Sequence, residues 1–190
     1  MGPNAIIQMG TALEAALGAG TARTLFGLAG LAPYLAAPPE HMVAESEVMR
    51  LHAVLRRTLA APTALEVARN AGHATGDYLL RHRIPPAAQR LLRRLPRRAA
   101  SRLLVAAIRR HAWTFAGSGR LRALHGPPPV FVMEGCALCR DAHSPVPVCG
   151  YYAATFERLF RVLVEPKATV IETDCAASGA ATCRFEVRWG

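Results

Sequence analysis

The C-terminal stretch from residue 167 to residue 189 constrains the fold more than any other part of the chain. In the segment 182–189 apolar and charged side chains alternate, with Cys183, Phe185, Val187 and Trp189 on one face and Arg184, Glu186 and Arg188 on the other. Such alternation is typical of a β-strand with one buried face. A second strand is predicted near 167–173, and Ser178–Gly179 predicts the turn between the two. The chain therefore ends in an antiparallel pair of strands.

An amphipathic helix is predicted just before these strands, over residues 151–164. Its large apolar side chains share one side and charged residues lie opposite them: the apolar set is Tyr152, Phe156, Leu159, Phe160 and Leu163, and the charged set is Glu157, Arg158 and Arg161. Pro166 ends this helix. A further strand is predicted near 129–134, after a proline-rich break. The C-terminal part is thus expected to be a small antiparallel sheet with one packed helix.

The preceding part of the chain, to about residue 120, is predicted to be helical. Apolar side chains recur at helical spacing over 4–18, over 20–31 after a glycine break, over 44–59 and over 63–82. Two arginine-rich helices follow, divided at Pro96. Gly72 and Gly76 would let another helix approach the 63–82 helix closely. The predicted fold class is α+β, in a single domain 1–190 whose residues 1–122 are mainly helical and whose residues 123–190 contain the sheet.

Positive charge is concentrated in one part of the sequence. Between Tyr78 and Met133 there is no acidic residue but there are twelve arginines, and the whole chain has a formal net charge of +10. A surface this basic favours an anionic partner, such as a phosphate, a carboxylate, an acidic protein or an anionic lipid. No helix-turn-helix or RNA-binding motif accompanies the arginines, so we do not expect nucleic acid to be the partner.

The apolar segments do not predict a membrane span or a secretory signal. The longest uncharged apolar run, residues 24–39, is interrupted by prolines and falls short of the roughly 20 residues that cross a bilayer. The N-terminus lacks the basic region and cleavage site of a secretory signal. We therefore expect a cytoplasmic protein, whose five cysteines are free thiols or metal ligands rather than disulfides.

Four side chains near the C-terminus are candidate metal ligands. Cys149 lies just before the 151–164 helix, where the helix dipole favours a thiolate. Glu172 and Cys175 close one of the paired strands, and Cys183 opens the other. If the sheet brings these four together, they form the kind of tetrahedral site that zinc prefers.

Two other interpretations of the cysteines remain open from spacing alone. Cys136 and Cys139 form a CxxC pair, which could complete a Cys₄ site with Cys175 and Cys183. Buried cysteines also pack as small apolar residues without any metal. Spacing does not distinguish among these three cases.

The C-terminal motifs resemble those of a known family. Residues 149–160 (CGYYAATFERLF) and 170–187 (VIETDCAASGAATCRFEV) resemble the signature of the four-vinyl reductase domain, a ligand-binding module also found in sensor domains of phenol-responsive transcription activators. In those sensors a cysteine before a helix and a Glu-x-x-Cys-x7-Cys segment bind zinc. The resemblance implies a fold like that of vesicle-tethering complex subunits, a homodimer, and a structural Zn²⁺ at Cys149, Glu172, Cys175 and Cys183.

Nearly the whole chain also resembles the BchJ family of bacteriochlorophyll biosynthesis proteins. The resemblance is carried by residues 69–96 (RNAGHATGDYLLRHRIPPAAQRLLRRLP), 109–120 (RRHAWTFAGSGR) and 150–160. The family is named for reducing the 4-vinyl group of a divinyl (proto)chlorophyllide. It is also regarded as a tetrapyrrole carrier that works with magnesium chelatase and with the methyltransferase that follows it. The resemblance therefore implies either a reductase or a carrier.

The residues favour the carrier over the reductase. No G-x-G-x-x-G segment follows a predicted strand, and no other segment resembles a nicotinamide or flavin cradle, so no catalytic residue is assigned. A 4-vinyl reductase remains the alternative function, and a basic ligand-sensing regulatory module is a second alternative. We expect a tetrapyrrole-binding accessory protein that delivers its ligand to pathway enzymes.

The expected ligand is a Mg-tetrapyrrole, either a Mg-porphyrin or a protochlorophyllide-type intermediate. It needs an apolar slot, a cation for its carboxylate and a neutral imidazole for its magnesium. The candidate slot lies between the helices that carry His73 and His111, and the other candidate ligand-binding residues are Trp113, Phe115, Arg109 and Arg110. The basic face suits an acidic partner enzyme and peripheral contact with a photosynthetic membrane.

Overall fold

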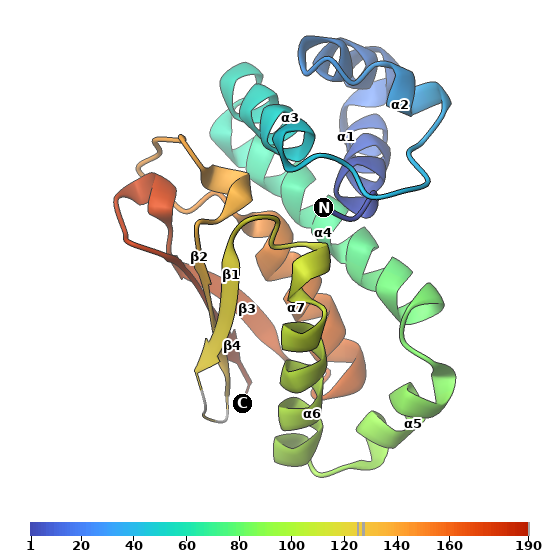
Figure 1. Cartoon of the computed structure of the whole chain (residues 1–190), viewed down its shortest axis with the longest axis vertical. Helices are drawn as coiled ribbons and strands as arrows, with labels where there is room; N and C mark the ends of the chain where they lie inside the picture. The colour runs from blue at the N-terminus through green and yellow to red at the C-terminus, as the bar shows by residue number, and fades with distance from the viewer. Residues whose placement is uncertain (125, 127, 190) are drawn as a thin grey trace.

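Helices precede a four-stranded sheet in this chain (Figure 1). The computed structural model describes residues 1–124, 126 and 128–189. The helices before the sheet are α1 (Asn4–Leu28), α2 (Pro33–Ala36), α3 (Glu45–Thr58), α4 (Ala61–His82), α5 (Pro86–Arg94) and α6 (Arg97–Arg110). This order confirms the predicted α+β class, including the division of the two arginine-rich helices at Pro96.

Helix α1 contains the glycine break that the sequence predicts. Gly18 has a φ of +83°, so the helix is kinked between its two predicted segments rather than interrupted by a loop. Glycine tolerates this φ because it has no Cβ. Among the residues that the structure describes, no helix combines the length and the apolar character needed to cross a membrane.

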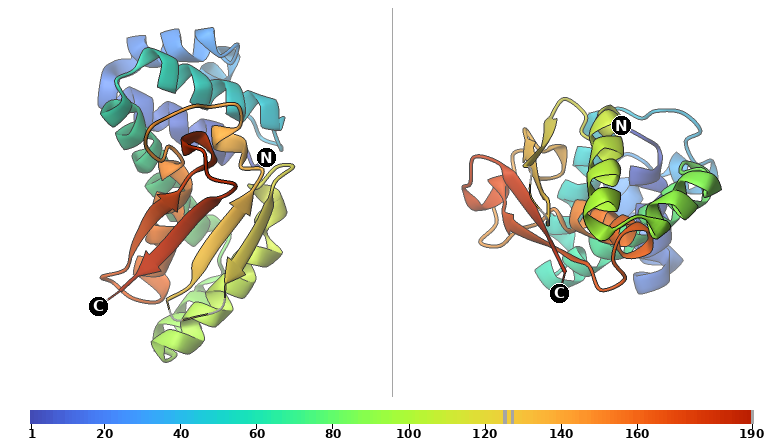
Figure 2. Two further views of the ribbon diagram at one scale, coloured as in Figure 1. Left: turned by 90° about the vertical axis from the view of Figure 1, so that its left-hand side faces the viewer. Right: turned by 90° about the horizontal axis from the view of Figure 1, so that it is seen from below.

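The sheet has the strand order β1-β2-β4-β3, and every neighbouring pair is antiparallel. Its strands are β1 (Arg120–Leu124), β2 (Val130–Glu134), β3 (Thr169–Asp174) and β4 (Cys183–Arg188). In the left view of Figure 2 one face of the sheet is turned toward the reader, and α7 (Gly150–Leu163) lies behind it. The strands predicted near 129–134, 167–173 and 182–189 are therefore present, and the last two pair as expected.

Strand β1 was not predicted. The sequence analysis expected helices to about residue 120, whereas α6 ends at Arg110 and β1 begins at Arg120. The strand is only five residues long, and its outward-facing arginines look like a continuation of the arginine-rich helices. Pairing with β2 stabilises it, including an ion pair between Arg122 and Glu134. The expected boundary at residue 122 falls inside this strand.

Two glycines let α4 and α7 cross in close contact. A Cβ placed on Gly72 would lie 2.2 Å from the carbonyl oxygen of Tyr151, and one on Gly76 would lie 2.6 Å from Cβ of Arg158. The contact also contains a buried hydrogen bond of 2.8 Å between the hydroxyls of Thr75 and Tyr151. The predicted close approach of a second helix to α4 is therefore confirmed.

Aromatic side chains fill the space between α7 and the sheet. Phe131 of β2 faces Phe185 of β4 in the register, and its ring stacks on Phe156 of α7 at 4.5 Å between centroids. Tyr152 and Phe160 extend the same layer and are fully buried. Burying rings of this size contributes on the order of 2–3 kcal/mol each. This layer holds α7, and with it Cys149, firmly against one end of the sheet.

Candidate functional site

Five cysteines converge at one end of the sheet, although they come from separate segments. Cys136 and Cys139 lie on a 3₁₀ turn that follows β2, and Cys149 immediately precedes α7. Cys175 follows β3, and Cys183 begins β4. In the left view of Figure 2 the turn after β2 and the turn between β3 and β4 lie side by side beneath α3. The fold thus gathers thiols that are up to 47 positions apart in the sequence.

The sulfur atoms of these cysteines lie within contact distance of one another. Sγ of Cys149 is 3.5 Å from that of Cys136, 4.0 Å from that of Cys175 and 3.9 Å from that of Cys183. Sγ of Cys183 is 3.3 Å from that of Cys139 and 4.0 Å from that of Cys175. Each cysteine is at most 2% exposed. We call these five cysteines, together with Glu172, the thiol cluster.

Glu172 reaches the thiol cluster with one of its oxygens left unpaired. Its Oε2 accepts a hydrogen bond of 2.7 Å from the backbone N–H of Cys149, which fixes the carboxylate at the start of α7. Its Oε1 is buried and has no hydrogen-bond partner among the described residues. A buried oxygen without a partner is costly unless a cation or a proton satisfies it. This orphaned oxygen fits a metal ligand better than a packing residue.

Two overlapping sets of four donors have a spacing that suits a metal ion. The first is the predicted set, Cys149, Glu172, Cys175 and Cys183, and the second is Cys136, Cys139, Cys149 and Cys183. Within each set, one donor atom of every residue lies within 4.8 Å of the others. The structure therefore brings the predicted ligands together. It also groups the CxxC pair with Cys149 and Cys183, rather than with Cys175 and Cys183 as the sequence alternative had it.

The thiol cluster cannot hold all its negative charges without a cation. Burial, followed by the neighbouring Cys175, raises the pKa of Glu172 to about 9. Hydrogen bonds with the other thiols, that with Cys136 foremost, raise the pKa of Cys149 and lower that of Cys139. Opposite shifts in adjacent thiols mean that ionising one group suppresses ionisation of the next. A divalent cation would remove this constraint, because it stabilises every thiolate that it binds.

Arg56 of α3 is a residue of this site that the sequence did not reveal. Its Nη1 donates a hydrogen bond of 2.7 Å to the carbonyl of Leu138, which lies between the two cysteines of the CxxC pair. Burial lowers the pKa of Arg56, and the charges of the cluster thiols, Cys149 first, raise it. Arg56 and Leu138 are 82 positions apart, so no local pattern connects them. The guanidinium supplies positive charge beside the thiols.

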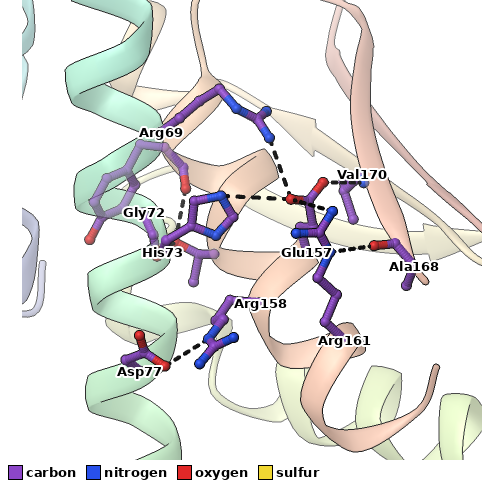
Figure 3. Close-up of polar contacts among 11 residues, drawn as sticks. Arg69, Gly72, His73, Asp77, Glu157, Arg158, Arg161, Ala168 and Val170 are labelled. Carbon is purple, nitrogen blue, oxygen red and sulfur yellow. Dashed lines mark hydrogen bonds and ion pairs between the residues drawn. The ribbon is translucent and has the colours of Figure 1, made fainter. Parts of the chain in front are cut away.

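A second polar group of the structure surrounds Glu157 of α7, between α4 and β3 (Figure 3). Glu157 lies on the side of α7 opposite the aromatic layer, yet it is only 4% exposed because α4 covers it. Its Oε1 lies 3.5 Å from Nη2 of Arg69 and 3.4 Å from Nη2 of Arg161. Its Oε2 accepts a hydrogen bond of 3.0 Å from the backbone N–H of Val170. Glu157 therefore fastens β3 to the two crossing helices.

His73, one of the predicted ligand-binding residues, belongs to this group. Figure 3 shows its ring directed from α4 toward Glu157, and its Nε2 lies 3.6 Å from Oε1 of that residue. Burial lowers the pKa of His73, while Glu157 acts in the opposite direction. The side chain is 32% exposed. His73 is therefore a neutral, partly accessible imidazole with one nitrogen facing a carboxylate.

The other predicted ligand-binding residues lie at the C-terminal end of α6. Trp113 lies in a 3₁₀ turn (Ala112–Thr114) and is 67% exposed, and Arg109, Arg110 and His111 are exposed beside it. Phe115 instead packs against the aromatic layer, with its ring 5.9 Å from that of Tyr152. Among the described residues, no hydrogen bond, ion pair or ring contact joins His73 to His111. Four of the six predicted residues therefore share one exposed surface.

A hollow of about 360 Å³ opens beside the thiol cluster. Its lining includes Cys136, Cys139, Arg140, Asp141 and His143. A smaller hollow of about 80 Å³ lies where α1 meets α2. Neither hollow is lined by the predicted tetrapyrrole-binding residues.

Solved structures share this fold at low sequence identity. The phenol-responsive sensory domain of the transcription activator PoxR, solved with phenol, has a TM-score of 0.58 and is 16% identical, covering 77% of this chain and 75% of its own. An H-NOX protein from S. oneidensis in the Fe(II)NO ligation state has a TM-score of 0.54 and is 13% identical, covering 99% of this chain and 98% of its own. At these identities the similarity shows the fold alone.

Sequence comparison places the chain in a family. The family model of the four-vinyl reductase domain matches residues 129–189, which contain β2, α7, β3, β4 and the thiol cluster. The Bacteriochlorophyll synthase 23 kDa chain of Cereibacter sphaeroides is 46% identical, covering 98% of this chain and 89% of its own length. The protein of the same name from Rhodobacter capsulatus is 41% identical, covering 97% of this chain and 85% of its own length. The chain therefore belongs to the family of the bacteriochlorophyll synthase 23 kDa chains, the BchJ-like proteins, whose C-terminal part is a four-vinyl reductase domain.

Proposed function

We propose that this chain is an accessory protein of bacteriochlorophyll biosynthesis that binds a Mg-tetrapyrrole intermediate and delivers it to pathway enzymes. The observation that carries the proposal is the 46% identity over 98% of the chain to a Bacteriochlorophyll synthase 23 kDa chain. The intermediates of such a pathway are flat apolar macrocycles with carboxylates. A protein that carries them needs a binding surface and a docking surface, and no redox cofactor of its own.

The exposed end of α6 is the proposed binding surface. Trp113 offers a large ring that is 67% exposed, on which a macrocycle can stack. The exposed Arg109 and Arg110 can pair with a carboxylate, and His111 offers an imidazole for the magnesium. His73 is the alternative imidazole, but its Nε2 faces Glu157. A surface site of this kind suits a carrier, since release matters as much as binding, and we expect an affinity in roughly the micromolar range.

The proposed docking surface consists of the exposed arginines of α5 and α6. They are Arg90, Arg93, Arg94, Arg98 and Arg102, and Leu91 and Leu103 are exposed among them. Such a surface would attract an acidic partner enzyme, for which the pathway's magnesium chelatase and methyltransferase are the candidates, and it would also favour contact with an anionic membrane. A homodimer remains part of this proposal.

A structural zinc ion is proposed at Cys149, Glu172, Cys175 and Cys183. Sulfur and oxygen donors are the ligands that zinc takes in closed tetrahedral sites. The unpaired Oε1 of Glu172 and the burial of the cysteines support this assignment. When bound, the ion would link the β3–β4 pair to the start of α7. A closed site has no open position for a reacting ligand, so its role would be structural.

The carrier proposal can be tested by titrating the purified chain with Mg-protoporphyrin and with protochlorophyllide. We expect a saturable Soret shift together with quenching of tryptophan fluorescence. Trp113→Phe should abolish most of the quenching, whereas Trp189→Phe should retain it, because Trp189 stacks on Phe160 of α7, away from the proposed surface. His111→Ala should reduce the Soret shift more than His73→Ala does.

Each outcome of this titration bears on a different part of the proposal. If the wild-type chain produces no spectral change, it is not a tetrapyrrole carrier. If binding persists in both histidine variants, the assignment of the magnesium ligand is wrong but the carrier function stands. If the pure chain converts the vinyl group to an ethyl group with NADPH, the 4-vinyl reductase is the correct function instead.

A further inference from the structure

The thiol cluster contains more donors than one zinc ion can use. Five thiols and one carboxylate converge, whereas a tetrahedral ion binds four. We propose that the cluster holds two divalent metal ions of the zinc type, bridged by the thiolates of Cys149 and Cys183. This inference rests on the zinc site proposed above and adds a second metal position next to it. Two tetrahedral ions that share two donors require six donor residues, which is the number that the cluster provides.

The spacing of the sulfur atoms fits two tetrahedra that share an edge. A zinc–sulfur bond of about 2.3 Å gives a tetrahedron with a sulfur–sulfur edge of about 3.8 Å. The shared edge, between Sγ of Cys149 and Sγ of Cys183, measures 3.9 Å. The two donor sets described above have these two residues in common and no others. One ion would therefore lie on each side of the Cys149–Cys183 edge.

Each side of this edge supplies two further donors. On the first side, Sγ of Cys175 is 4.0 Å from both bridging sulfurs, and Glu172 provides its unpaired Oε1. On the second side, Cys136 lies 3.5 Å from Cys149 and Cys139 lies 3.3 Å from Cys183. The edges on the second side are shorter by a few tenths of an ångström, an adjustment that the turn carrying the CxxC pair can make.

The charge of the buried site also permits a second ion. One dication with the donors Cys149, Glu172, Cys175 and Cys183 leaves a formal charge of −2, with the other two thiols protonated. Two dications with all six donors ionised leave the same −2. Binding the second ion releases the protons of Cys136 and Cys139 to solvent and adds no net charge to the interior. Arg56, which hydrogen-bonds Leu138 on this side, offsets part of the remaining charge.

The second position has a route to solvent. Cys136 and Cys139 line the hollow of about 360 Å³ beside the cluster, together with Asp141 and His143. A metal ion can reach the CxxC pair through this hollow without unfolding the β3–β4 pair. The first position lies deeper, against the start of α7. The second ion should therefore exchange faster with chelators than the first.

The test measures how many metal ions the full-length chain binds. The reduced, metal-free chain is loaded with Zn²⁺, desalted, and its metal-to-protein ratio is determined by elemental analysis. A ratio of two supports the bridged pair. A ratio of one overturns the second position but leaves the proposed zinc site intact, and a ratio of zero overturns both. Iron with inorganic sulfide in the protein as purified would overturn both zinc assignments.

Cobalt substitution tests the bridge itself. The first equivalent of Co²⁺ should give the paramagnetic signal and charge-transfer bands of a tetrahedral thiolate site. The second equivalent should weaken the paramagnetic signal, because thiolate bridges couple the two ions magnetically. A signal that doubles instead would mean that the ions are not bridged, and the proposal would be wrong.

Matched variants separate the two positions. The double variant Cys136→Ser, Cys139→Ser should lower the ratio from two to one, with an unchanged circular dichroism spectrum. Cys183→Ser should lose both ions together, because it removes a bridge. If the double variant keeps the wild-type ratio, the CxxC pair is not a ligand and the inference fails.

Discussion

Replacing Gly72 by alanine should separate the two helices on which the site depends. The new methyl group would lie 2.2 Å from the carbonyl oxygen of Tyr151 and 2.9 Å from Cβ of Ala154. The first distance is about 1 Å short of van der Waals contact. The neighbour on that side is backbone, which cannot move aside as a flexible side chain can. Helix α4 or α7 must therefore shift by an amount of this order.

The expected cost follows from what the shift disrupts. Overpacking of this kind costs about 1–3 kcal/mol. The hydroxyl of Thr155 donates a hydrogen bond of 3.0 Å to the carbonyl of Gly72, and the Thr75–Tyr151 hydrogen bond lies one turn away. Weakening these buried bonds adds about 1 kcal/mol. Alanine recovers up to about 1 kcal/mol through its higher helix propensity. The net loss in the free energy of unfolding should be about 1–3 kcal/mol.

Urea unfolding followed by far-UV circular dichroism measures this loss. Gly20→Ala is the matched control, because Gly20 lies in helix α1 and a Cβ there meets no atom within 4 Å. The control should be as stable as the wild type, or up to about 1 kcal/mol more stable. Gly72→Ala should also weaken metal binding, since Cys149 immediately precedes α7. If Gly72→Ala proves as stable as Gly20→Ala, the two helices do not touch at this point and our reasoning is refuted.

Three further perturbations are informative. Glu157→Gln should lower the free energy of unfolding by about 1–2 kcal/mol, a value reduced because its cationic partners are partly exposed, and the more exposed Glu186→Gln should have a much smaller effect in the same urea assay. Burial lowers the pKa of His52 to about 3, so the wild type should lose stability as the pH falls from about 6.5 toward 3, and His52→Phe should flatten this part of the pH profile. Cys175→Ser should lose metal and loosen the C-terminal half in hydrogen-exchange measurements, and an unchanged metal content would contradict the first metal position.

Local patterns in the sequence predicted most of the elements. The alternation in 182–189 and the apolar side of 151–164 follow the two-residue and 3.6-residue repeats of strands and helices, which a segment carries whatever surrounds it. Strand β1 escaped prediction because five residues are too few to distinguish alternation from the arginine-rich helices before it. The burial of Glu157 also escaped prediction, since its position on α7 reads as a charged surface until α4 is packed over it.

The candidate site was predictable only as far as spacing reaches. The interval from Cys149 to Glu172 and the motif that ends at Cys183 identify four donors of one metal position. The CxxC pair was visible as well, but not the residues with which it would group. The predicted slot between His73 and His111 required a distance between helices, and the structure leaves these two residues without contact.

The sequence by itself determined which side chains can donate to a metal, where the helices and strands run, and where positive charge accumulates. These are properties of short segments, and short segments encode them completely. Only the tertiary structure decided that Cys136 and Cys139 meet Cys149 and Cys183 at one end of the sheet. Their meeting depends on contacts between distant segments, such as the hydrogen bond from Arg56 to Leu138, 82 positions away. Such distances result from the packing of whole helices against the sheet, which no local repeat encodes.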